Sequence, residues 1–180
     1  MKNVFVVWAC LAVMMMACSK PEEKAPDPVA ETKPPQAEFA DPKYAEMGKS
    51  NIAALSAKDV DTWMTSFSDN AKFYWSGGDS LIGKPAITDY WKNRFAKVID
   101  SISFVNDVWT PLKVNEPQRG PDAPGVWLLS WYQVKVKYKN GQKLSFWVHT
   151  DFHYDSTDKI DIAVQYIDRA PINAALAKRK

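Results

Sequence analysis

The hydrophobic period of this 180-residue chain changes near residue 100, and this change limits the possible folds more than any other feature. Before it, apolar residues recur at the spacing of an α-helix, and after it they alternate as in a β-strand. We expect helices at 42–55, 59–67 and 85–98, and strands at 71–75, 101–113, 126–138, 144–154 and 160–168. This order predicts an α+β domain, in which about three N-terminal helices pack on one curved, mostly antiparallel sheet.

The two longest alternating stretches flank Asn140-Gly141. Asn-Gly between such stretches is a strong signal for a β-hairpin with a two-residue turn. That turn would place Trp131 opposite Thr150 in the hairpin. Both faces of the hairpin are then partly apolar, so we expect helices to cover one face and a second subunit to be able to cover the other.

Residues 1–17 have the pattern of a signal peptide, with Lys2 followed by an apolar stretch at 4–16 that is short for a membrane span. The segment ends in Ala17-Cys18, which resembles the bacterial lipobox, where a cysteine after a small residue receives diacylglycerol. The resemblance implies that Cys18 is the lipid-bearing first residue of the mature protein. The alternative is an ordinary secretory signal with an incidental cysteine.

Residues 18–41 are rich in Pro, Glu, Lys and Ala and almost lack aliphatic residues. Such a segment cannot bury a core, so it is predicted to be a disordered tether. Ser19 stands where lipoproteins retained in the inner membrane of diderm bacteria usually carry Asp, and this implies the outer membrane. The rest of the chain is expected to form one domain at 42–170 and a basic tail at 171–180.

Composition and missing motifs exclude several classes of function. The formal charge of +2 argues against a nucleic-acid-binding protein. Cys10 and Cys18 are the only cysteines and both precede the folded part, which therefore has no disulfide and no thiolate metal site. The sequence has no Gly-rich phosphate loop and no nucleophile elbow, so no cofactor is expected.

Several short phrases, taken in their order and spacing, resemble the SnoaL-like branch of the nuclear transport factor 2-like superfamily. They are Asp61-Thr62-Trp63, Asp69-Asn70-Ala71, Leu81-Ile82-Gly83-Lys84-Pro85, Val148-His149 and Tyr166-Ile167-Asp168. The resemblance implies a cone-shaped half-barrel with a pocket between the helices and the concave sheet, often dimeric through the sheet's outer face. The superfamily includes ketosteroid isomerase-like and polyketide cyclase-like enzymes and also non-catalytic binding modules, so the fold alone does not define the function.

The candidate pocket residues are mostly aromatic. They are Trp63, Tyr74, Trp91, Trp109, Trp131, Thr150 and Tyr166. A cone lined by Trp and Tyr suits a flat or apolar ligand better than a charged one, although the same side chains could simply fill a core.

His149, Asp151 and His153 alternate along one predicted strand and therefore point to the same side. On the pocket side, His149 and Asp151 could act as general acid and base, as in an isomerase or cyclase. The three positions span about 13 Å, which is too far for one metal ion, so no metal site is expected. The alternative places all three on the outer face, in water or between two subunits.

These observations favour a lipid-anchored protein of the cell envelope whose pocket binds a small apolar or aromatic molecule or a partner protein. An isomerase- or cyclase-type enzyme using His149 or Asp151 is the alternative hypothesis.

Overall fold

The computed structural model describes residues 33–116 and 123–178. Its helices and strands all lie in one unit, Pro34–Lys180. The helices are α1 (Lys43–Ser56), α2 (Val60–Met64), α3 (Lys84–Lys97) and α4 (Ala170–Ala177). The strands are β1 (Ala37–Phe39), β2 (Phe67–Trp75), β3 (Ser80–Ile82), β4 (Ile99–Val114), β5 (Gly125–Tyr138), β6 (Lys143–Tyr154) and β7 (Ile160–Tyr166). No helix in the described ranges is long and apolar enough to cross a bilayer.

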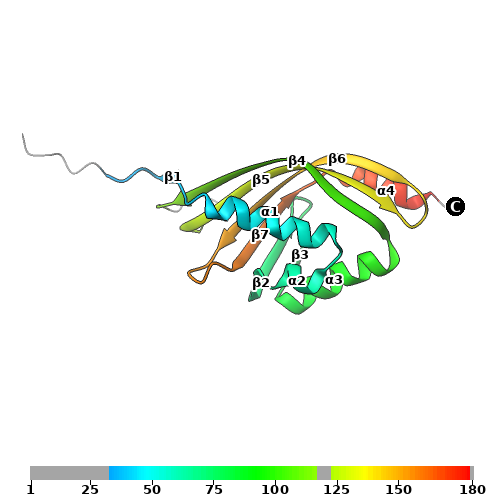
Figure 1. Ribbon diagram of the computed structural model, residues 1–180, viewed down its shortest axis with the longest axis horizontal. Coiled ribbons are helices and arrows are strands. Elements are labelled where there is room, and N and C mark those ends of the chain that lie inside the picture. Colours follow the sequence, from blue (N-terminus) through cyan, green and yellow to red (C-terminus); the bar gives the residue numbers. More distant parts are fainter. Residues whose placement is uncertain (1–32, 117–122, 179–180) are drawn as a thin grey trace, which may run out of the picture. The chain divides into compact units, whose positions relative to one another are not determined.

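The described strands form one curved sheet in the order β1-β4-β5-β6-β7-β2-β3. Neighbouring strands are antiparallel except β2 and β7, which run parallel. Helices α1, α2 and α3 lie on the concave side of the long strands β4, β5 and β6 (Figure 1). The expected α+β architecture, with a curved and mostly antiparallel sheet, is confirmed.

The first two helices begin where the sequence indicates. The Asp41 carboxylate accepts a hydrogen bond from the Lys43 backbone N–H at 2.8 Å, and Asp59 accepts one from the Thr62 N–H at 3.0 Å. These bonds satisfy N–H groups that have no partner within the helix. Helix α3 has Pro85 in its first turn, where the missing N–H costs nothing.

The second helix is shorter than expected, and Phe67 begins a strand. The carbonyl of Ser66 accepts a hydrogen bond from the Ile160 N–H at 2.8 Å, and Phe67 then pairs with Ile160 of β7. Residues 68–70, predicted to close the helix, lie within β2. The prediction was wrong here because long-range pairing with β7 outweighs the helical spacing of one apolar residue.

The hairpin of β5 and β6 forms, but its predicted register is wrong by one residue. Trp131 pairs with His149, not with Thr150, and Tyr138 pairs with Gln142 across a three-residue loop. Gly141 has a φ of 89°, whereas Asn140 is not among the residues of positive φ. This is the arrangement of a type I turn followed by a glycine bulge, not of the two-residue turn, which needs positive φ at both residues.

The folded unit extends beyond both ends of the predicted domain. Strand β1 pairs with β4 although it lies in the predicted tether, and α4 forms in the predicted basic tail. Helix α4 buries Ile172 and Ala175, and the Asn140 side chain donates hydrogen bonds at 2.9 Å to the carbonyls of Ala175 and Lys178. The predicted signal peptide, Cys18 and most of the predicted tether lie outside the described residues.

Candidate ligand cavity

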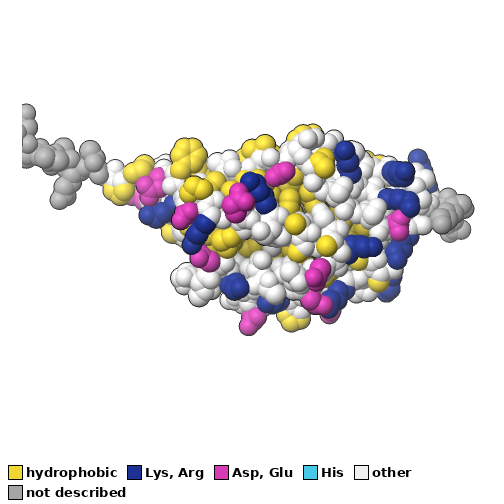
Figure 2. Space-filling model, viewed as in Figure 1, with side chains coloured by type: hydrophobic (Ala, Val, Ile, Leu, Met, Phe, Trp, Pro, Cys, Tyr) yellow, Lys and Arg dark blue, Asp and Glu magenta, His cyan; other side chains and the backbone are white. Residues whose placement is uncertain are grey.

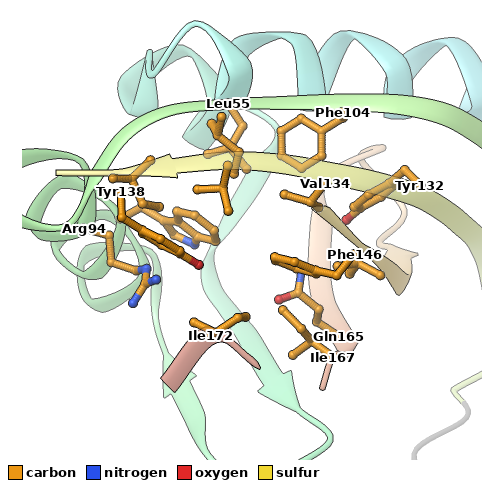
Figure 3. A pocket seen from close by; sticks show the side chains of 15 residues that line it. Leu55, Arg94, Phe104, Tyr132, Val134, Tyr138, Phe146, Gln165, Ile167 and Ile172 are labelled. Atoms are coloured by element: carbon orange, nitrogen blue, oxygen red, sulfur yellow. The ribbon is translucent and has the colours of Figure 1, made fainter. Parts of the chain in front are cut away.

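A cavity of about 80 Å³ lies between the helices and the concave face of the sheet, and we call it the central cavity. Its wall is almost entirely apolar. Figure 3 shows side chains from α1, α3, α4 and the long strands converging on it. The lining includes Leu55, Ile102, Phe104, Val134, Val136, Phe146, Val148, Ile167 and Ile172.

Three further cavities share lining residues with the central one, and two of them share its Trp91 and Gln165. A mouth cavity of about 180 Å³ shares Trp91, Arg94 and Gln165 with it and is also bordered by α4. An inner cavity of about 10 Å³ shares Trp91, Tyr132 and Gln165 with it and reaches Asn51 and Thr150. We call the central, mouth and inner cavities, which are neighbouring spaces that share lining residues, the channel, and polar residues lie at its inner and mouth ends.

A hydrogen-bond network closes the inner end. The Tyr132 hydroxyl lies 2.7 Å from Thr150 Oγ1, and Gln165 Nε2 donates to the same oxygen at 3.3 Å. Gln165 Oε1 accepts from Trp75 Nε1 at 3.0 Å. Burial raises the pKa of Tyr132 to about 12, so its phenol stays neutral at physiological pH.

Two buried N–H groups at this channel lack hydrogen-bond partners among the described residues: Asn51 Nδ2 and Trp91 Nε1. The other atom of the Asn51 amide is satisfied, since Oδ1 accepts from Trp63 Nε1 at 2.7 Å. An unpaired buried donor costs roughly 1–3 kcal/mol. Such groups in a natural protein call for an explanation, and a bound ligand is one.

Arg94 and Tyr138 stand at the junction of the central cavity and the mouth. Figure 3 shows the Arg94 guanidinium beside the Tyr138 ring, whose hydroxyl points into the cavity. Burial raises the pKa of Tyr138, and the charge of Arg94 partly offsets this rise. In the described structure the guanidinium has no carboxylate partner and lies 5.7 Å from the centre of the Tyr90 ring.

Three of the predicted pocket residues line the channel. Trp91 borders all three cavities, and Trp63 and Thr150 border the inner one. Trp63 and Trp91 meet edge to face with ring centroids 5.6 Å apart.

The other four predicted pocket residues do not line the channel. Trp109 packs against the core over Gly48, and Tyr74 alternates with the buried Phe73 and Trp75 along β2. Trp131 and Tyr166 are 38% and 46% exposed. Trp131 lies on the outer face of the sheet opposite His149, because side chains alternate along β5 and the next one, Tyr132, is buried on the concave side.

His149 and Asp151 lie on that outer face too. His149 Nε2 is 2.9 Å from Asp151 Oδ1, and His149 Nδ1 is 2.9 Å from the Ser130 carbonyl oxygen. The imidazole is stacked between Trp131 and Tyr166, with ring centroids 4.4 Å and 5.3 Å away. The pair therefore makes no contact with the channel.

His153, on the same strand, also lies between a carboxylate and a backbone carbonyl oxygen. Its Nδ1 is 2.5 Å from Asp161 Oδ1, and its Nε2 is 3.2 Å from the Pro124 carbonyl oxygen. Among the described residues, no cluster of His, Cys, Asp or Glu has the geometry of a metal site.

Sequence reasoning missed Asn51, Arg94 and Gln165 as channel residues. Asn51 was visible as a polar residue inside the apolar stripe of α1, which is a usable signal. Arg94 lines the central cavity and the mouth, although it stands among other basic residues of α3, Lys92 and Lys97. The helical pattern alone could not separate Arg94 from its basic neighbours.

The comparisons with known proteins agree with this fold. Residues 46–109 match the family model of the SnoaL-like domain. A putative polyketide cyclase from Xanthomonas campestris pv. campestris aligns with a TM-score of 0.59 at 13% identity, over 74% of this chain and 96% of that one. A putative isomerase from Bacillus subtilis aligns with a TM-score of 0.57 at 18% identity, over 74% of this chain and 92% of that one.

An NTF2-like protein of unknown function from Burkholderia pseudomallei aligns with a TM-score of 0.58 at 9% identity, over 74% of this chain and 97% of that one. No curated protein matches this chain. At these identities the structural likenesses establish the fold and leave the activity open. The folded unit thus has the nuclear transport factor 2-like cone fold. Within it, residues 46–109 are similar to the SnoaL-like domain.

Proposed function

We propose that this protein is an exported lipoprotein whose SnoaL-like domain binds a small, largely apolar molecule in its channel without transforming it chemically. The observation that carries the proposal is the channel itself. It is walled mainly by apolar side chains, and two of its lining residues, Asn51 and Trp91, carry buried N–H groups that lack partners among the described residues. Ligand sites commonly combine an apolar wall with a few placed polar groups.

Catalysis is less well supported because the channel offers no group suited to proton transfer near neutral pH. None of the described residues that line the three cavities is Asp, Glu or His. The charged groups there are Arg94 and Arg169, and the Arg169 guanidinium is paired with Asp79. The alternative, an isomerase or cyclase using His149 or Asp151, would need a substrate on the opposite face of the sheet.

Binding can be tested with methyl 2-naphthoate, a neutral two-ring probe, titrated into the mature chain carrying Cys18→Ser while tryptophan fluorescence is followed. Val134→Phe places a ring in the central cavity and should weaken binding by about tenfold or more, since displaced apolar contacts dominate the affinity. Ile82→Phe is the matched control, because Ile82 is 58% exposed on the edge strand β3 and lines none of the three cavities. Equal affinity in the two variants, or no binding by the unsubstituted domain, would contradict the proposal.

Export and anchoring rest on the sequence of the N-terminus. We expect the mature chain, expressed in a diderm bacterium, to begin at Cys18 and to carry diacylglycerol there. Mass spectrometry of the purified N-terminus measures this directly, and Cys18→Ser should abolish both the lipid and recovery in the membrane fraction. An unmodified Cys18, or cleavage at another bond, would show that the predicted lipidation of Cys18 is wrong.

A further inference from the structure

The polar groups that face the channel are mainly hydrogen-bond donors. Asn51 and Trp91 are 3% and 8% exposed, and their unpaired atoms are N–H groups. The Tyr138 hydroxyl, which can also donate a hydrogen bond, points into the cavity (Figure 3). A ligand that satisfies these groups must bring oxygen acceptors, because a molecule made only of hydrocarbon would leave them unpaired.

A further hydrogen-bond donor at the channel, Arg94, carries a positive charge. Arg94 borders both the central cavity and the mouth, and in the described structure no carboxylate neutralises it. The other arginine at the mouth, Arg169, is paired with Asp79. A guanidinium at the edge of an apolar cavity binds a planar carboxylate well, since it offers parallel N–H donors in a region where water competes poorly.

Helix α4, which borders the mouth, lies at an end of the folded unit that carries many basic side chains (Figure 2). The mouth is bordered by α4, through Ile172, Asn173 and Leu176. Lys and Arg side chains gather at the end of the folded unit where α4 and the β5–β6 hairpin tip lie (Figure 2). Basic groups near an opening raise the local concentration of anions and speed their entry.

The dimensions limit the apolar part of the ligand. The central cavity and the mouth measure about 80 Å³ and about 180 Å³. An engineered cavity of about 150 Å³ accommodates benzene, so the combined space suits one or two rings. Aromatic walls from Trp91, Phe104 and Phe146 favour a flat body.

We propose that the ligand is a small aromatic or alicyclic carboxylic acid, whose carboxylate pairs with Arg94 and the Tyr138 hydroxyl while its rings occupy the combined space of the central cavity and the mouth. This inference rests on the proposed binding function and adds the chemical class of the ligand and its orientation. The Asn51 amide at the inner end takes an oxygen acceptor at the far end of the molecule, where one is present.

The test compares 2-naphthoate with its methyl ester, which has the same rings but no charge. Affinities are measured by calorimetry for the mature chain carrying Cys18→Ser and for Arg94→Met and Lys97→Met in that background. Lys97 is the matched control, since it is an exposed basic residue of the same helix. We expect the acid to bind about 10- to 100-fold more tightly than the ester, Arg94→Met to abolish this preference, and Lys97→Met to retain it.

The ester also controls for folding, because an Arg94→Met domain that still binds the ester has kept its channel. Arg94→Lys should retain part of the preference, since it keeps the charge and loses the planar fork. Equal binding of acid and ester by the unsubstituted domain would overturn the inference and leave the binding function standing. Failure of both probes to bind would overturn both proposals.

Discussion

At the scale of single residues, Gly48 sets the distance between helix α1 and the sheet. A Cβ atom at this position would lie 2.5 Å from the Trp109 ring and 2.6 Å from the Leu128 side chain. Real Cβ atoms do not approach so closely, so the helix can lie this near to β4 and β5 only with glycine here. The close packing of α1 on β4 and β5 therefore depends on glycine at this one position.

We predict that Gly48→Ala destabilises the domain by about 1–3 kcal/mol, because α1 or Trp109 must move to relieve the overlap. Gly77→Ala is the control: a Cβ there would meet nothing closer than the Arg169 side chain at 3.9 Å. That change should be neutral or slightly stabilising. Urea unfolding followed by far-UV circular dichroism measures both, and equal stabilities would show that the contact at Gly48 relaxes freely.

At the scale of helices and strands, sequence periodicity predicted most elements. It failed for elements whose formation depends on contacts with residues far away in the sequence. Asp41, Asp59 and Pro85 marked helix starts because capping is a local interaction. Strands β1 and β3 were not predicted, because each has only three residues and depends on a neighbouring strand. Helix α4 was not predicted, because it is stabilised by contacts with distant parts of the chain. Its apolar residues are buried only when it packs on the sheet, and its Ala175 carbonyl accepts a hydrogen bond from the Asn140 side chain.

The hairpin register shows how one local error spreads through a site. Asn140-Gly141 correctly predicted a turn, but the sequence does not distinguish a two-residue loop from a three-residue loop with a glycine bulge. The difference of one residue regroups every side chain of β5 relative to β6. Trp131 consequently joins His149 on the outer face, and Ser130 joins Thr150 on the concave face.

At the scale of the whole molecule, the outer face of the sheet carries a row of side chains that crosses four strands. The row consists of Val108, Trp131, His149 and Tyr166, each paired with the next across neighbouring strands. Val108, Trp131 and Tyr166 are 53%, 38% and 46% exposed. Exposed apolar side chains gathered in one patch are typical of an interaction surface.

We propose that a second copy of the chain covers this row. Trp131→Lys should then shift the protein from dimer to monomer, because a charge at the centre of the interface would lose its water. Leu176→Lys is the control, since Leu176 is also partly exposed but lies on α4. Sedimentation equilibrium of the mature chain carrying Cys18→Ser measures this, and an unsubstituted domain that stays monomeric at tens of micromolar would rule out the dimer.

The sequence alone determined the class of fold, the number of main helices, the presence of the long hairpin and the family resemblance. These follow from local patterns, because capping, turns and hydrophobic period are encoded within a few residues. Only the tertiary structure decided which face of β5 and β6 meets the helices, since both faces are partly apolar. It also decided that Arg94 and Asn51 border the channel while His149 and Asp151 lie behind the sheet, because these positions depend on which face of the strands the helices pack against.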